Sequence, residues 1–170
     1  ATEGNYNFLD ANENPNPSTV NRYPDPNQLE LKKKIAALRS CSVDQLLIGN
    51  GSDEILDLVF RAFCVPNKDD VIIMPPTYGM YAVLANINGV GIKEVPLTAG
   101  FQLNTEKILS TVSPNTKAIF FCSPNNPSGN LFKRSDIKQL LNYFDGVVVI
   151  DEAYIDFTDE PSWLTQSDSY

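Results

Sequence analysis

Five short apolar runs alternate with segments of helical periodicity along most of the chain. Short runs of Val, Ile, Leu and Phe without polar alternation are typical of strands buried on both faces. Strands that alternate with helices favour a parallel sheet covered by helices on both sides. We therefore predict an α/β fold with three layers, α/β/α, around a mostly parallel sheet. The predicted strands are residues 46–48, 71–74, 91–95, 118–122 and 147–150.

The first part of the chain differs from the rest. Residues 1–24 are polar, rich in Asn and Pro, and show no sustained period, so we predict an extended N-terminal arm followed by one domain over residues 25–170. Within that domain, capping residues and a first-turn proline, Pro26, mark where helices begin. The predicted helix starts are Asp25, Ser52, Tyr78, Asn104 or Thr105, and Ser135.

Composition excludes several classes of protein. The chain has 170 residues, enough for one core, and contains no histidine, which excludes Ser-His-Asp triads, Cys-His dyads and His-ligated metals. We expect no metal site. The net charge of -8 argues against nucleic-acid binding, which needs clustered basic residues. The one basic cluster, Lys32 to Lys34, lies in a helical pattern and is interpreted as a solvated face.

Cysteine usage and hydropathy indicate a compartment. Cys41, Cys64 and Cys122 are odd in number and widely spaced, and the last two lie in apolar runs that are typical of core thiols. Buried free thiols favour a reducing cytoplasm. No stretch approaches the roughly 18 apolar residues of a membrane span, and no charged-then-apolar leader opens the chain. We therefore expect a cytoplasmic protein that does not contact a membrane.

Two motifs follow the early predicted strands. In residues 49–53, Gly-Asn-Gly-Ser-Asp, glycines and the start of a helix could accept a phosphate, although a tight turn with a serine cap explains the same residues. Tyr78 follows the next strand, where an aromatic ring could stack on a flat heterocycle or pack in the core. Both alternatives stay open on these residues alone.

Two further motifs follow the later strands. Asn126 lies in a loop fixed by two prolines and Gly129, and its amide both donates and accepts; an ordinary rigid turn is the alternative. Asp151 ends a strand, where a carboxylate could hold a proton on a ring nitrogen or simply cap the edge of the sheet. Because ligands of α/β proteins bind at the carboxyl ends of strands, the polar groups that follow these two strands suit such a ligand site.

Together these motifs resemble the pyridoxal 5'-phosphate (PLP) aminotransferases of the aspartate aminotransferase type. Within that superfamily they are most similar to the histidinol-phosphate aminotransferase family. The resemblance covers nearly the whole chain and implies a partial large domain of that fold. The stretches that carry it are residues 9–15, 21–25, 49–54, 76–81, 123–129 and 151–154.

The resemblance implies a role for each motif residue. The backbone of Gly51, Ser52 and Asp53 would hold the cofactor phosphate, and Tyr78 would stack on the cofactor ring. Asn126, rather than Asn125, and Tyr154 would bind the phenolic oxygen of PLP. Asp151 would face the pyridine nitrogen. Tyr23 would reach the cofactor phosphate of a neighbouring subunit, which implies a homodimer.

The chain departs from the family in one respect. The family's Schiff-base lysine lies beyond its Asp-x-x-Tyr strand, whereas all nine lysines here precede Asp151. The arginines that bind the substrate carboxylate should also lie downstream. We therefore expect an N-terminal fragment that lacks the rest of the large domain and the small domain. It should contain no catalytic residue and be inactive alone, because that lysine anchors the cofactor and moves the proton.

The resemblance predicts transamination in L-histidine biosynthesis. Histidinol phosphate and imidazole acetol phosphate would be one substrate pair, with glutamate and 2-oxoglutarate as the other. Two alternatives remain open on the sequence. One is another aminotransferase or an amino-acid-phosphate decarboxylase of the same fold; the other is a non-catalytic PLP-binding or interaction module.

Overall fold

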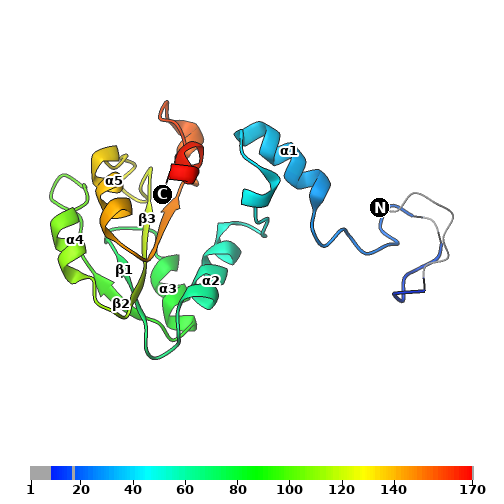
Figure 1. Ribbon diagram of the computed structural model, residues 1–170, viewed down its shortest axis with the longest axis horizontal. Helices are drawn as coiled ribbons and strands as arrows, with labels where there is room; N and C mark the ends of the chain where they lie inside the picture. The colour runs from blue at the N-terminus through cyan, green and yellow to red at the C-terminus, as the bar shows by residue number, and fades with distance from the viewer. Residues whose placement is uncertain (1–8, 17, 170) are drawn as a thin grey trace. The chain divides into compact units, whose positions relative to one another are not determined.

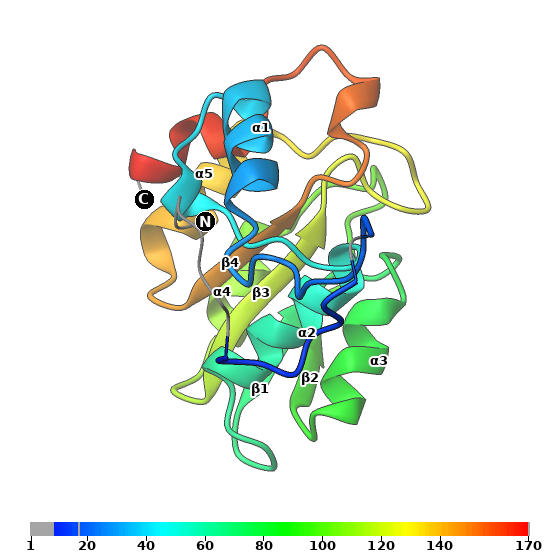
Figure 2. The ribbon, with the colours of Figure 1, turned by 90° about the vertical axis from the view of Figure 1, so that its right-hand side faces the viewer.

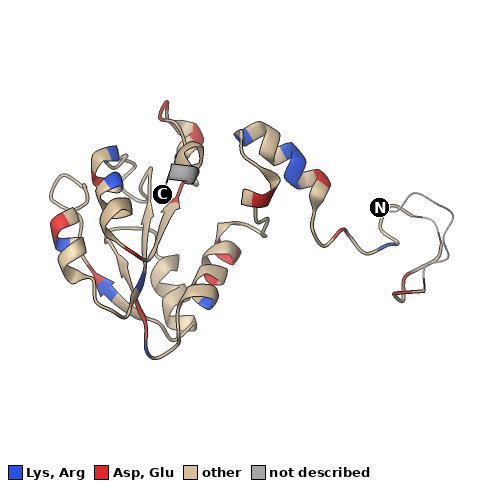
Figure 3. Ribbon diagram, viewed as in Figure 1, with Lys and Arg blue, Asp and Glu red and all other residues tan. Residues whose placement is uncertain are grey.

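A computed structural model describes residues 9–16 and 18–169 of the chain. The chain divides into two compact units, Ala1–Leu46 and Leu47–Tyr170. The first unit contains the helix α1, Leu29–Arg39, and a short 3-10 helix, η1, Val43–Gln45 (Figure 1). Basic residues colour one stretch of α1 in Figure 3, and Lys33 and Lys34 are exposed, as expected of a solvated face.

The start of α1 differs from the prediction. The Asp25 carboxylate accepts hydrogen bonds from the backbone N–H of Asn27 and of Leu29, each 3.0 Å long. It therefore caps a turn that precedes the helix, and the helix itself begins at Leu29, after Gln28 in a left-handed conformation. The described residues before position 25 contain no helix or strand.

The second unit is built on a four-stranded sheet. Its strands are β1 (Asp70–Ile73), β2 (Gly91–Glu94), β3 (Thr116–Cys122) and β4 (Val147–Asp151), in the order β2-β1-β3-β4 (Figure 2). All three neighbouring pairs are parallel, which confirms the predicted α/β class. The predicted strand at residues 46–48 is wrong: this segment pairs with none of the four strands of the sheet, and Leu47 is 62% exposed.

Helices cover both faces of the sheet (Figure 1). The predicted starts hold to within two residues, and at α4 (Thr105–Thr111) the Asn104 side chain caps the helix by accepting from the N–H of Lys107 at 3.1 Å. Two 3-10 helices, η2 (Ile155–Phe157) and η3 (Trp163–Ser169), follow β4. The helices of this unit are α2 (Ser52–Phe63) and α3 (Met80–Ile87) on one face and α4 (Thr105–Thr111) and α5 (Arg134–Tyr143) on the other; η2 is Ile155–Phe157 and η3 is Trp163–Ser169.

The core has two halves because successive strand residues point to opposite faces. Ile73 and Phe120 pack with α2 and α3, whereas Ile72 and Ile119 pack with α4 and α5. Buried Cys64 and Cys122 belong to the first half, which confirms that they are core thiols. Among residues 9–16 and 18–169, no helix is both long and apolar enough to span a lipid bilayer.

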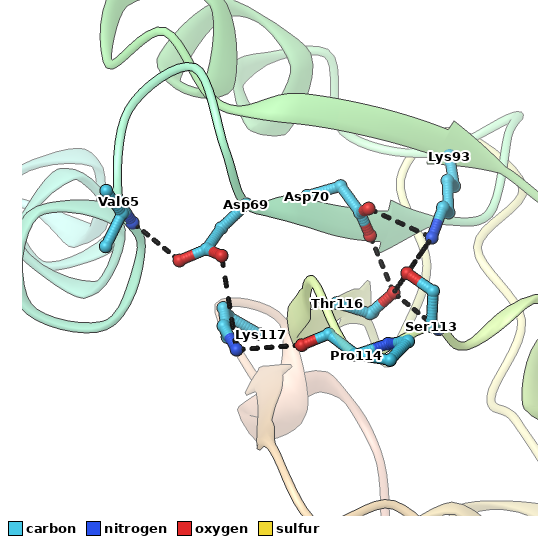
Figure 4. Close-up of polar contacts among 8 residues, drawn as sticks. All are labelled: Val65, Asp69, Asp70, Lys93, Ser113, Pro114, Thr116 and Lys117. Atoms are coloured by element: carbon cyan, nitrogen blue, oxygen red, sulfur yellow. Dashed lines mark hydrogen bonds and ion pairs between the residues drawn. The ribbon is translucent and has the colours of Figure 1, made fainter.

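Near the amino ends of β1 and β3, charged side chains bind one another (Figure 4). The Lys93 ammonium lies 2.9 Å from the Asp70 carboxylate and also binds Thr116 at 3.1 Å and Ser113 at 2.6 Å. The Thr116 hydroxyl in turn donates to Asp70 at 2.6 Å. Three strands are thereby joined at this edge, and we call these four residues the amino-edge network.

Candidate functional site

The carboxyl edge of the sheet carries the candidate site. Asp151 is the last residue of β4 and lies in register with Cys122, the last residue of β3. A cavity of about 140 Å³ opens beside them. Five of the residues predicted from sequence line this one cavity, although they come from four separate segments: Ser52, Tyr78, Asn126, Asp151 and Tyr154.

Both carboxylate oxygens of Asp151 are held from within the protein. Oδ1 accepts from the backbone N–H of Ala153 at 3.1 Å, and Oδ2 accepts from the Tyr81 hydroxyl at 3.0 Å. The N–H of Ser123 donates to the Asp151 carbonyl at 2.9 Å, which extends the pairing of β3 with β4. The carboxylate is therefore fixed in orientation while it still borders the cavity.

Sequence reasoning missed Tyr81 as a partner of Asp151. The only signal was its place one helical turn after Tyr78, on the face of α3 that packs against the sheet. Periodicity alone identifies such a residue as core, and Tyr81 is indeed fully buried. The hydrogen bond of its hydroxyl depends on how α3 is placed on the sheet relative to the end of β4, which the local sequence does not specify.

Tyr78 forms a half-buried wall of the cavity. Its hydroxyl donates to the Asp53 carboxylate at 3.1 Å, and its ring meets Tyr81 edge-on, with 5.6 Å between centroids and 86° between planes. Burial, followed by the hydrogen bond to Asp53, raises the pKa of Tyr78 above its ordinary value. The phenol thus remains a neutral donor, and its ring is locked in place.

The amino end of α2 meets the same cavity through Ser52. Gly51, just before the helix, has φ of 81°, a left-handed conformation that favours glycine over any residue with a Cβ. The predicted cap is therefore shifted by one residue, since Ser52 is the first residue of α2. The unpaired N–H groups and the dipole of a helix amino end attract anions such as phosphate.

Asn125 and Asn126 are neighbours with different environments. Asn125 is buried, and its amide nitrogen donates to the carbonyl of Pro76 at 3.0 Å and to Ser128 Oγ at 2.6 Å. Its amide oxygen accepts from the Thr77 hydroxyl at 3.3 Å. Asn126 instead lines the cavity. Sequence reasoning did not identify Asn125 as the residue that ties this loop to the loop carrying Tyr78.

The Cys122 thiol lines the cavity, but its surroundings keep it protonated. Its sulfur donates to the carbonyl of Pro124 at 3.0 Å. Burial raises the pKa of the thiol to about 11, and the negative charge of Asp151 contributes to the same shift. Because the thiolate is the nucleophilic form, this cysteine does not act as a nucleophile near neutral pH.

A second cavity, of about 320 Å³, adjoins the first and shares Asn126 and Tyr154 with it. Phe157 forms another wall, and its ring centroid lies 6.5 Å from that of Tyr154. The two cavities together offer a carboxylate, aromatic rings, an amide and a helix amino end. This set of groups suits a flat, phosphorylated heterocycle that contains a ring nitrogen.

Tyr23 is the predicted site residue that lies in the other unit. Its side chain is 70% exposed, and its backbone N–H donates to the Glu13 carboxylate at 2.7 Å, which also binds Arg22 at 2.7 Å. No lysine lines the two cavities in the part of the chain that the structure describes. Over the same residues, no group of three or more Asp, Glu or Cys side chains could hold a metal ion.

The chain is similar to proteins of one enzyme family. A family model described as "Aminotransferase class I and II" matches residues 7–168. The chain is 60% identical over 163 residues to the histidinol-phosphate aminotransferase of Flavobacterium johnsoniae, covering 96% of this chain and 47% of that protein. It is 53% identical over 167 residues to that of Cytophaga hutchinsonii, covering 96% and 48%. The chain spans about half the length of these curated relatives.

Solved structures show the same fold. The histidinol-phosphate aminotransferase from Clostridium acetobutylicum superposes with a TM-score of 0.78 at 26% identity, covering 88% of this chain and 44% of that one. An aspartate aminotransferase from Thermotoga maritima gives 0.72 at 27% identity, covering 83% and 41%. The four-stranded parallel sheet and its helices therefore form part of a domain known from these enzymes.

Proposed function

The chain belongs to the class I and II aminotransferase family, and from that membership we propose that the full-length protein transfers an amino group between L-histidinol phosphate and 2-oxoglutarate. The observation that carries the proposal is the meeting of Ser52, Tyr78, Asn126, Asp151 and Tyr154 around one cavity. Enzymes of this family depend on PLP, in agreement with the cofactor predicted from the sequence.

The residues at the cavity fit PLP chemically. When bound, PLP supplies an electron-withdrawing ring that stabilises negative charge developing on the substrate carbon. Asp151 would hold a proton at the ring nitrogen, since an adjacent carboxylate favours the protonated form of that nitrogen. The two hydrogen bonds from Ala153 and Tyr81 would keep the carboxylate aimed at that atom during turnover.

The remaining groups would hold and orient the cofactor. Tyr78 would stack on one face of the ring, and its bond to Asp53 would keep the aromatic plane fixed. The Asn126 amide and the Tyr154 hydroxyl would donate to the phenolic oxygen. The backbone N–H groups of Gly51, Ser52 and Asp53 would bind the phosphate at the amino end of α2, where the helix dipole favours negative charge.

One group needed for the reaction would come from elsewhere in the protein. The family's lysine, which binds the cofactor and moves a proton, has no counterpart at the cavities in the described residues. We place it in the part of the relatives' length that this chain does not span. The chain spans about half the length of these relatives, and we propose that its residues 25–170 form the first part of the large domain. Residues 1–24 would form an arm that precedes this domain.

The partners are also proposals. The relatives at 60% and 53% identity are histidinol-phosphate aminotransferases, which supports histidinol phosphate and imidazole acetol phosphate as one pair and glutamate and 2-oxoglutarate as the other. A homodimer would let Tyr23, exposed in the first unit, bind the cofactor phosphate of the neighbouring subunit. The free buried thiols of Cys64 and Cys122 suit a reducing, cytoplasmic compartment.

Steady-state assays of the full-length protein test the substrate. We expect kcat/KM with histidinol phosphate to exceed that with phenylalanine by orders of magnitude, with glutamate formed from 2-oxoglutarate. Preference for phenylalanine would indicate an aromatic aminotransferase. Carbon dioxide release from threonine phosphate without glutamate formation would indicate a decarboxylase. Stoichiometric PLP binding without turnover on any of these would favour a non-catalytic module.

A further inference from the structure

Tyr81 is a fully buried tyrosine whose hydroxyl donates a hydrogen bond to the Asp151 carboxylate. Its ring packs in the core half that contains α2 and α3, with its centroid 5.6 Å from that of Phe120 and the same distance from that of Tyr78. Phenylalanine would provide the same packing. Core packing therefore explains the ring but not the hydroxyl, because burying a polar group costs free energy unless the group is hydrogen-bonded.

We propose that Tyr81 is a positioning residue: its hydroxyl fixes the Asp151 carboxylate toward the cofactor cavity and stabilises its charge. This inference rests on the proposed function, because it gives Asp151 the role of facing the cofactor's ring nitrogen. It extends that function to a residue that lies behind the cavity rather than in its lining.

The two hydrogen bonds to the Asp151 carboxylate have different roles. Ala153 is two residues away, in the turn that directly follows β4, so its N–H holds the carboxylate only relative to the adjoining backbone. Tyr81 lies 70 residues away, on α3, and reaches Oδ2 at 3.0 Å. It is thus the contact that fixes the carboxylate relative to another element, and α3 also follows directly on the loop that carries Tyr78.

The Cys122 thiol also lies close to this hydroxyl. The Cys122 thiol lies on the same face of the sheet, in register with Asp151, and donates to the carbonyl of Pro124 at 3.0 Å. Burial, and next the charge of Asp151, raise the pKa of the Tyr81 phenol far above its ordinary value. The Tyr81 hydroxyl therefore stays protonated and donates a hydrogen bond to Asp151.

A double-mutant cycle on the full-length protein separates positioning from packing. The variants are Tyr81→Phe, Asp151→Asn and both together, and the primary readout is the dissociation constant of PLP from the apoprotein. Removing a hydrogen bond to a charged group should weaken PLP binding roughly tenfold or more in Tyr81→Phe. In the Asp151→Asn background the same change should cost less than about twofold, because the charge that Tyr81 supports is already gone.

Two further readouts and a matched control complete the test. Tyr143, on α5, is 74% exposed, and Tyr143→Phe removes the same hydroxyl without affecting PLP binding. Tyr81→Phe should lower kcat while the KM for histidinol phosphate stays within about twofold, since Asp151 would act on the cofactor and not on substrate binding. Melting of the apoprotein should be alike in the two tyrosine variants.

The outcomes are distinct. An equal loss of PLP affinity in both backgrounds, or no loss in either, overturns the positioning role. A lower melting temperature of Tyr81→Phe with unchanged PLP affinity also overturns it and leaves a role in packing. If the unmodified protein fails to bind PLP at one site per chain, the proposed function fails, and this inference fails with it.

Discussion

The two edges of the sheet use polar residues in opposite ways. At the amino edge, Asp70, Lys93, Thr116 and Ser113 satisfy one another, and their distances of 2.6–3.1 Å leave little for a ligand to bind (Figure 4). At the carboxyl edge, Asp151 and Tyr78 are held by hydrogen bonds with Tyr81 and Asp53, and both border a common cavity with Asn126.

The difference shows how one sheet separates stability from function. In a parallel sheet all strands end at the same edge, so the loops that follow them converge there. Polar groups at the other edge can be paired permanently and hold the strands together. The comparison predicts that changes at the amino edge affect unfolding, whereas changes at the carboxyl edge affect the cofactor and turnover.

The largest expected effect is that of Asp151→Asn in the full-length protein. The substitution keeps the size of the side chain but removes its negative charge, so turnover should fall by roughly a thousandfold. The melting temperature of the apoprotein should stay within a few degrees. Steady-state kinetics and calorimetry measure the two quantities. Turnover like that of the unmodified protein would remove Asp151 from the site, and loss of folding would leave it a structural role.

Asp70→Asn is the matching change at the amino edge. It leaves Lys93 without its ion-pair partner, and we expect the free energy of unfolding to fall by about 1–3 kcal/mol. Urea titration of the apoprotein measures this, while turnover per folded molecule should be unchanged. Lys33→Met is the control, because its pair with Glu30 is exposed and should contribute nothing measurable. A drop in turnover without loss of stability would contradict the division between the edges.

Tyr78→Phe should have a smaller effect than either. The stacking ring remains, and only the hydrogen bond to Asp53 is lost, so PLP affinity should fall a few-fold. Tyr78→Ala removes the ring and should weaken binding considerably more. Fluorescence titration of the apoproteins compares the two. Equal losses would show that the hydroxyl, and not the ring, is what the cofactor needs.

The smallest effect concerns the thiols. Cys122 has a pKa raised to about 11 in the folded state, above the ordinary value of 9.0, so the folded form resists the loss of its proton. Its contribution to stability is constant below about pH 9 and becomes unfavourable as pH rises from there toward 11, because the unfolded state ionises first.

Alkylation at pH 8 should modify Cys41 and spare Cys64 and Cys122 until urea unfolds the protein. Rapid modification of Cys122 would contradict its burial.

The fold class and the candidate-site residues that follow their strands could be predicted from the sequence because both depend on local patterns. Apolar runs such as 118–122 and caps such as Asn104 are determined within a few residues, and Asp151 stands directly after its strand. The strand predicted at 46–48 failed for the same reason, since three apolar residues do not reveal whether a partner strand is present. Tyr81 and Asn125 were missed because their hydrogen bonds join segments 70 and 49 residues apart.

The hydrogen bonds of Asn125 also affect when the candidate site forms during folding. Its side chain binds the loop after β1 and belongs to the loop after β3, so the two walls that carry Tyr78 and Asn126 come together only when these strands are paired. Contacts between segments distant in sequence form late, because closing the intervening chain costs entropy. A newly made chain should therefore acquire helices and strand segments before it can hold the cofactor. Uptake of PLP would then report that β1 and β3 are paired, and the cofactor would bind only to chains in which this pairing has formed.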